Sequence, residues 1–377
     1  IPGEEQSFSL SGGRSISNIF RFRRTLDEAS FFGFLATDRR MVDGDGSGSV
    51  VGFDTRYKFN KTYQVEFQTL FSHTQEPKDS LLVNSTIFGD DHNFTFDGES
   101  FTGNAMELEF RRETEHWGLE AGYDHRTPTF RADNGFISNN NQRRVYLQSF
   151  WFYTPDKLIS KIVGGFHTGL EYNFDGEKKS RYTSFFGNVV LPRQTRLNVN
   201  ITVIPFERFK ATDLENLWTI RANINSRFNK FLAFGGSLSE GVNTVTFLDV
   251  PEKGNSNSFS LWAQLKISDR MQISGSYENH KMTTLDKKKE HYSGYLTGIR
   301  MNYQYNQALS FRLLGQYNDF SQTFQLQPLL SYQPSPFTIF YIGSTSNQIA
   351  ENLSIDSIQE SQINDRQLFL KFQYLFD

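Results

Sequence analysis

The sequence of 377 residues contains no cysteine, which excludes disulfides, cysteine nucleophiles and thiolate metal sites. No stretch of it approaches the ~20 consecutive apolar residues that a membrane-spanning helix needs. Hydrophobic residues make up only 37% of the chain and the formal net charge is −3, so charge gives no reason to expect a nucleic-acid partner. At roughly 150 residues per domain, the length suits two or three soluble domains or one large β-barrel.

Aromatic side chains, by contrast, are abundant, at 15% of the residues with 38 Phe and 16 Tyr. They occur in segments where apolar and polar residues alternate with a period of two, whereas helical periodicity is nearly absent. The segment from Arg196 to Val203 reads R-L-N-V-N-I-T-V, with aliphatic residues on one face and polar residues on the other. Segments 63–68, 106–111 and 218–225 repeat the pattern, so each predicts a β-strand with one apolar and one polar face.

Short and long connections between the predicted strands alternate along the chain. Three short ones contain asparagine, at 59–62, 228–231 and 305–308, and asparagine tolerates the positive φ of two-residue hairpins. Further short turns are predicted near 113–115, 155–157, 192–194, 268–270 and 333–335. Long polar connections are predicted near 75–100, 127–143, 205–216, 239–257, 280–293 and 346–364. This alternation is typical of an up-and-down barrel in a bacterial outer membrane, with short turns in the periplasm and longer loops outside.

The breaks between segments predict about 18 strands from residue 28 onward, and a further strand or hairpin between Phe8 and Arg24 is an alternative. An even number is expected when both ends lie in the periplasm, so we predict about 18 strands within a range of 16 to 20. Aromatic residues flank the short turns, as Tyr57, Phe59 and Tyr63 do. They favour an interfacial girdle over the ordinary aromatic enrichment of strands.

The end of the chain carries the most specific pattern, because an apolar residue stands at every second position from 368 to 376. These residues are Leu368, Leu370, Phe372, Tyr374 and Phe376. An amphipathic last strand that ends on an aromatic residue is typical of the signal that the outer-membrane assembly machinery recognises. The additional Asp377 is a small departure from that signal.

The sequence therefore predicts an all-β protein, a transmembrane antiparallel up-and-down β-barrel in the outer membrane of a Gram-negative bacterium. We assign residues 1–17 to an N-terminal segment that leads into the barrel and residues 18–377 to the barrel itself. The expected partners are outer-membrane lipid and lipopolysaccharide, the assembly machinery at the C-terminal strand, and other envelope proteins. The chain opens at Ile1 without a signal peptide, so we expect that one was removed or that a longer protein precedes it.

Two groups of residues carry a resemblance to a known family. One lies between Ser30 and Gln68 and contains F-F-G-F-L-A-T-D-R-R (31–40) and V-V-G-F-D-T-R-Y-K-F (50–59); the other is F-R-A-D-N-G-F (130–136), followed by Arg143 and Arg144. They resemble the C-terminal barrel of uncharacterised Bacteroidetes-type envelope proteins, in which a domain similar to carbohydrate-binding module family 9 precedes the barrel. The resemblance implies a link to glycan use and brings no catalytic residues.

A glycine-rich segment is the first candidate site. Asp43-Gly44-Asp45-Gly46-Ser47-Gly48, with Asp54 further along, matches the oxygen spacing of an EF-type calcium loop. Aspartate stands where that loop usually has glutamate, and residues 50–59 are predicted to form a strand. A flexible hairpin loop is the ordinary alternative, so the identity of any metal ligand stays unknown.

Two histidines beside acids are the second candidate. His125 follows Asp124 at a predicted strand end, and His280 follows Glu278 on a predicted inward face. Outer-membrane hydrolases carry catalytic groups at such rims, but a catalytic triad is defined by geometry and no such set is recognisable in the sequence. Solvated rim histidines are the ordinary alternative, and we assign neither catalytic residues nor a cofactor.

Two short segments, 79–81 and 356–358, resemble the O-glycosylation signal of Bacteroidetes envelope proteins, and both fall in predicted long loops. The polar strand faces carry charges of both signs, which in a barrel interior require water, a plug or ion pairs. The leading prediction is an outer-membrane channel or uptake barrel with weak ion selectivity. The alternatives are a non-conducting scaffold for partner proteins and an outer-membrane hydrolase.

Overall fold

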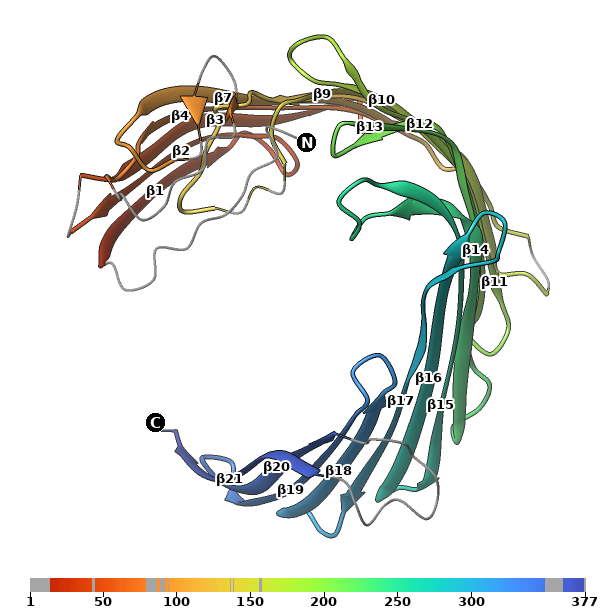
Figure 1. The fold of residues 1–377 in the computed structure, drawn as a ribbon. Helices are drawn as coiled ribbons and strands as arrows, with labels where there is room; N and C mark the ends of the chain where they lie inside the picture. Colours follow the sequence, from red (N-terminus) through yellow and green to blue (C-terminus); the bar gives the residue numbers. More distant parts are fainter. Residues whose placement is uncertain are drawn as a thin grey trace.

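A computed structural model of the protein consists of β-strands, turns and loops (Figure 1). It describes residues 14–42, 45–78, 87–88, 92–93, 95–135, 137, 139–155, 158–349 and 362–375. Nineteen strands form one sheet, and a two-stranded hairpin of β5 and β6 lies apart from it. Among the described residues, no helix is long and apolar enough to cross a membrane.

Each strand of the sheet pairs with its neighbours in the chain, and every pairing is antiparallel. In chain order the strands are β1 (Ser15–Thr25), β2 (Phe31–Met41), β3 (Ser47–Phe59), β4 (Tyr63–Gln75), β5 (Ile87–Phe88), β6 (His92–Asn93), β7 (Ser100–Glu113), β8 (Trp117–Arg126), β9 (Gln142–Tyr153), β10 (Lys161–Tyr172), β11 (Lys178–Leu191), β12 (Thr195–Phe209), β13 (Thr212–Arg227), β14 (Leu232–Val245), β15 (Glu252–Ser268), β16 (Met271–Thr284), β17 (Glu290–Gln304), β18 (Leu309–Asn318), β19 (Thr323–Ser335), β20 (Thr338–Ile349) and β21 (Gln362–Tyr374).

The sheet curves into the wall of an up-and-down barrel (Figure 1), which confirms the predicted fold class. Within the described residues, β1 pairs only with β2 and β21 only with β20, so the curved wall has two free edges. Eighteen of the strands follow residue 28, as predicted, and β1 is the additional N-terminal strand. Ser15 at the start of β1 pairs with Met41, so β1 begins at the end of the barrel where the long connections lie.

The alternation of apolar and polar residues with a period of two explains why the two sides of the sheet differ in polarity. On β12, the aliphatic face of Leu197, Val199, Ile201 and Val203 is 36–45% exposed, with no protein layer covering it. The polar face of the same strand lies on the concave side, where Asn198 and Thr202 bond to side chains of neighbouring strands. A sheet that is apolar outside and polar inside is the pattern of a barrel surrounded by lipid.

The asparagine turns form for two different reasons. Asn60 and Lys61 both have positive φ, of 57° and 53°, as the two-residue hairpin requires. At Asn229 and Asn306 the side-chain oxygen instead accepts hydrogen bonds from backbone N–H groups two and three residues later. The predicted turns were therefore correct, but positive φ explains only the first of them.

Three of the predicted long loops are largely strand. The connection at 205–216 shrinks to Lys210 and Ala211, both with positive φ, between β12 and β13. Those predicted at 239–257 and 280–293 shrink to residues 246–251 and 285–289. The prediction was wrong because these strands continue with polar residues on both faces, a composition that reads as loop in the sequence. The connections at 76–99 and 127–141 are long, as predicted.

Aromatic residues form two outward-facing belts. Near the short turns, Tyr57 and Phe59 stack at 6.0 Å between ring centres, and Phe59 and Tyr63 at 5.4 Å. A second belt crosses β16, β17 and β18, where Tyr277, Tyr295 and Tyr317 follow one another at 5.6 Å and 5.7 Å. Along β17, Tyr303 is eight positions after Tyr295, which is about 20 Å in height for a strand tilted by ~40°. That height agrees with an apolar band flanked by aromatic girdles.

Candidate functional site

The concave side of the wall is the candidate site, because it carries the polar strand faces. Strand pairing identifies its members, since directly paired residues of an antiparallel sheet point to the same side. Gly103 pairs with Ser72, which pairs with Val50, and the connection between β8 and β9 packs against this face. We call that connection, residues 127–141, the inner loop. Figure 1 shows it on the inside of the curve beneath β3 and β7.

Backbone contacts fix the inner loop to the wall. The N–H of Arg131 donates to Ser72 Oγ at 3.2 Å, and Arg39 donates to the carbonyl of Asp133 at 3.1 Å. A Cβ at Gly103 would lie 2.4 Å from the backbone of Phe130, so only glycine permits this approach. The loop therefore lies directly on β2, β4 and β7 and takes up space inside the barrel.

A buried ion pair links the inner loop to the connection that follows β4. Glu76 is 1% exposed and bonds to Arg131 Nη1 at 2.7 Å, while its other oxygen has no partner among the described residues. The guanidinium of Arg131 lies 4.8 Å from the ring centre of Phe101. Burial raises the pKa of the Glu76 carboxyl, and the charge of Arg131 offsets only part of that rise.

The inner wall from β1 to β11 contains large charged side chains in pairs. Every pair except Arg111–Glu109 joins two different strands, and the N–O distances are from 2.6 to 3.8 Å. The pairs are Arg21–Asp54, Arg56–Glu66, Arg111–Glu109, Arg111–Glu120, Arg144–Asp124 and Lys179–Glu171. These contacts neutralise the paired side chains locally, and several of the acids are largely buried.

The first histidine candidate is not assembled by the fold. Asp124 faces inward, where Arg144 bonds it at 2.6 Å, whereas the next residue, His125, faces outward. There His125 bonds to Asn104 at 2.7 Å and to Tyr123 at 3.1 Å. Sequence neighbours on a strand lie on opposite sides of the sheet, so this acid and histidine cannot act together.

The second candidate does face inward, as predicted. His280 Nε2 lies 2.8 Å from Glu278 Oε1 on β16, and Ser258 is the residue opposite His280 on β15. In the part of the chain that the structure describes, no serine hydroxyl hydrogen-bonds to His280. The pair is therefore an acid–histidine contact without the nucleophile that a hydrolase needs.

The proposed calcium loop is not formed either. Asp54 lies in the middle of β3, paired with Gly33 and Gln68, and both its oxygens bond to Arg21. Asp45 lies two residues before β3 begins, so the seven strand residues 47–53, about 23 Å, lie between Asp45 and Asp54. Asp43 lies outside the described residues, as do the two glycosylation-like segments 79–81 and 356–358. Within the described residues no three His, Asp or Glu side chains form a group that could hold a metal.

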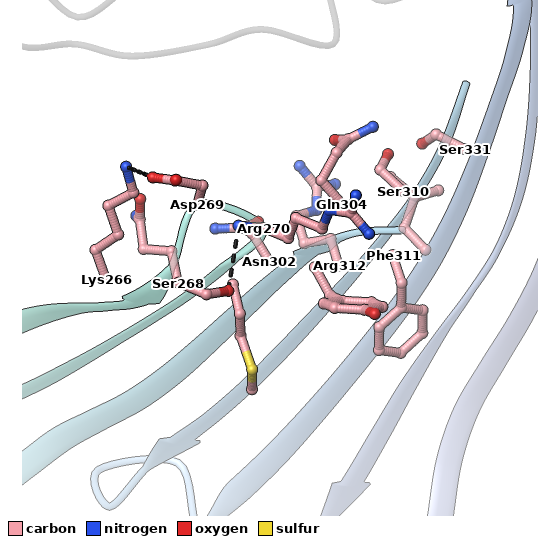
Figure 2. A pocket seen from close by; sticks show the side chains of 14 residues that line it. Lys266, Ser268, Asp269, Arg270, Asn302, Gln304, Ser310, Phe311, Arg312 and Ser331 are labelled. Carbon is pink, nitrogen blue, oxygen red and sulfur yellow. Dashed lines mark hydrogen bonds and ion pairs between the residues drawn. The ribbon is translucent and has the colours of Figure 1, made fainter. Parts of the chain in front are cut away.

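The inner wall from β14 to β17 differs, because many of its inward side chains are small. The small inward residues at mid-height are Ser237, Ser239, Ser258, Ser260, Ser274, Ser276 and Gly298, and Trp262, Glu278 and His280 lie among them. Toward the short turns, β15 to β19 surround a pocket of about 380 Å³ lined by Lys266, Asn302, Gln304, Ser310 and Arg312, among others. Figure 2 shows Gln304 and Arg312 together on one side of the sheet and Phe311 on the other.

No known protein family matches the chain, and no curated protein matches it. Solved structures do match in fold. The ferric enterobactin receptor of Pseudomonas aeruginosa has a TM-score of 0.56 at 8% identity over 90% of this chain and 67% of that one. The siderophore receptor PirA of Acinetobacter baumannii has 0.56 at 10% over 98% and 72%, and the copper transporter OprC has 0.57 at 9% over 96% and 72%. The chain thus has the fold of outer-membrane receptor barrels.

Proposed function

We propose that the protein is an outer-membrane uptake barrel whose solutes cross along the inner wall, past the inner loop. The observation that carries the proposal is the division of strands such as β3, β12 and β13 into an apolar outer face and a polar inner face. The charged inner side chains require water around them or partners beside them. A wall of 19 strands belongs to the size class whose interior holds an aqueous channel or a plug.

The inner loop supplies the narrowest part of this path. It is attached to β2, β4 and β7 and to the buried Glu76, so it holds its place on the wall rather than extending into solvent. A loop fixed inside a barrel restricts the cross-section through which a solute passes. The receptor and transporter barrels of similar fold support uptake as the general role.

The outer membrane as location, with lipopolysaccharide and the assembly machinery as partners, is part of the same proposal. The two aromatic belts support it, since they would lie at the two interfaces of the bilayer. We also propose that the chain is the barrel of a Bacteroidetes-type envelope protein linked to glycan use. Only the resemblance of the segments 31–40, 50–59 and 130–136 supports that finer assignment.

Conductance in planar lipid bilayers tests the proposal. The purified barrel should conduct, and a variant in which 131–139 is replaced by a short glycine–serine linker should conduct more. A variant with the same linker in place of 285–289, between β16 and β17, is the control and should leave conductance unchanged. If both the protein and the loop variant are silent after demonstrated insertion, uptake is excluded and a scaffold for partner proteins replaces it.

A further inference from the structure

The charges of the inner wall are divided between its two parts. From β3 to β11 the acidic side chains described above each have a basic partner. From β12 to β21, six inward basic side chains form no ion pair with any described residue: Arg196, Arg221, Arg227, Arg300, Arg312 and Lys371. Among the acids of this part, Asp269, Glu278 and Asp213 are bonded to Lys266, His280 and Arg208, whereas Glu207 and Asp365 accept hydrogen bonds from the neutral side chains of Thr244 and Gln367.

Two of these arginines are close neighbours. Arg300 on β17 pairs with Leu314, and Arg312 on β18 pairs with Asn302, so the two guanidinium groups stand at diagonal positions of one ladder. Diagonal positions are about 7–8 Å apart at the backbone, within reach of one shared ligand. Asn302, Gln304 and Ser310 surround Arg312 with neutral polar groups (Figure 2).

Two adjacent unpaired guanidinium groups repel each other, and an anion between them removes that repulsion. Each guanidinium presents several N–H donors in a planar fork that matches the oxygens of a carboxylate or a phosphate. The neighbouring amide and hydroxyl groups can complete the hydrogen bonds of such a group without adding negative charge. On the paired wall opposite, Arg56, Arg111 and Arg144 are already bonded to acids and therefore attract anions less strongly.

We infer that the wall from β12 to β21 is an anion-binding surface and that Arg300 and Arg312 hold a carboxylate or phosphate group of the transported solute. The inference rests on the proposed uptake function and names its substrate class. It replaces the expectation of weak ion selectivity, which assumed that charges of both signs were interspersed. Instead, most inward charges are bonded in pairs on one side, whereas six basic side chains on the other side form no ion pair with any described residue.

The reversal potential in a potassium chloride gradient tests the inference. The protein should favour chloride over potassium by about tenfold, as a path lined by one sign of charge concentrates the opposite ion. Arg300→Gln combined with Arg312→Gln should remove most of that preference. Arg181→Gln combined with Arg366→Gln removes the same amount of charge from outward positions, and this control variant should retain the preference for chloride. A conducting protein without chloride preference would overturn the inference and leave uptake intact.

A second readout does not need conduction. Trp262 faces inward on β15, and its indole N–H bonds to Asn225 at 3.3 Å. With the other three tryptophans replaced by phenylalanine, iodide should quench its fluorescence in detergent more strongly than caesium does. Adding Arg300→Gln and Arg312→Gln should lower the quenching of Trp262 by iodide. Adding Arg181→Gln and Arg366→Gln instead should leave that quenching unchanged. Equal quenching by both ions would overturn the inference even if the barrel proved silent in bilayers.

Discussion

The two parts of the inner wall differ in how their charged side chains are accommodated. Between β3 and β11, charged side chains are large and bonded in pairs, and the inner loop lies on the part of this wall nearest the long connections. Between β14 and β17, many inward side chains are serine or glycine, and Arg300 forms no ion pair with any described residue. Charges beneath a loop lose water and need partners, whereas charges on an uncovered wall keep their water. The side chains of Glu109, Glu120 and Asp124 are only 9–18% exposed, whereas Arg300 and Arg312 are exposed, so the two parts of the wall differ in the exposure of their charges.

The largest expected effect is the loss of accumulation in the outer membrane when the last strand, β21, is shortened. Deletion of residues 368–377 removes most of β21 and leaves β20 as an edge, and unpaired backbone groups in lipid cost several kcal/mol each. The deletion should abolish accumulation in the outer membrane, measured by fractionation and heat-modifiable migration on a gel. Deletion of Asp377 alone is the control and should leave accumulation unchanged. Normal levels of the larger deletion would show that this part of the wall is dispensable.

The next largest effect is on the free energy of unfolding, which should depend on whether the removed arginine has an ion-pair partner. Arg144→Ala leaves Asp124, which is 6% exposed, without its cation, and should lower the free energy of unfolding by about 2 kcal/mol. Arg312→Ala removes a charge that has no partner and should change it by less than about 0.5 kcal/mol. Urea unfolding in detergent or lipid vesicles, followed by tryptophan fluorescence, measures both. Equal losses of unfolding free energy in the two variants would mean that Arg144 and Arg312 do not differ in how strongly they are paired.

A smaller effect is expected from displacing the inner loop. Gly103→Ala places a methyl group against the backbone of Phe130 and should lift the loop from β7, so that single-channel conductance increases. Gly187→Ala, on β11, meets no atom within 4 Å and serves as the matched control. Protease cleavage within 127–141 should become faster only in the first variant. Unchanged conductance with faster cleavage would place the constriction elsewhere.

The smallest effect is the pH dependence of loop attachment. Because the pKa of Glu76 is raised when the loop is docked, the docked state holds its proton more tightly than the released state. Docking is therefore favoured at low pH and weakens as pH rises through the raised pKa. Protease protection of 127–141 should decline over that range in the native protein and stay constant in Glu76→Gln. A decline of equal size in the variant would assign the effect to another group.

Much of the fold could be predicted from the sequence, because a period of two identifies strands and short turns separate them. The polar extensions of β12 and β13 could not, since strands that leave the lipid lose their apolar face. The site was harder to predict. Asp124 and His125 are adjacent in sequence but lie on opposite sides of the sheet, and the division of charge depends on strand register. Residues such as Arg144 and Arg312 look alike until the residue across the ladder is known.

The small side chains of β14 to β17 have a geometric consequence. Serine and glycine leave free volume beside them, while the inner loop and the long paired side chains fill the side from β2 to β11. The proposed uptake path would therefore be eccentric, displaced from the centre of the barrel toward β14 to β17. A solute moving through it would travel along one side of the tube, within reach of Arg300 and Arg312, instead of down the middle.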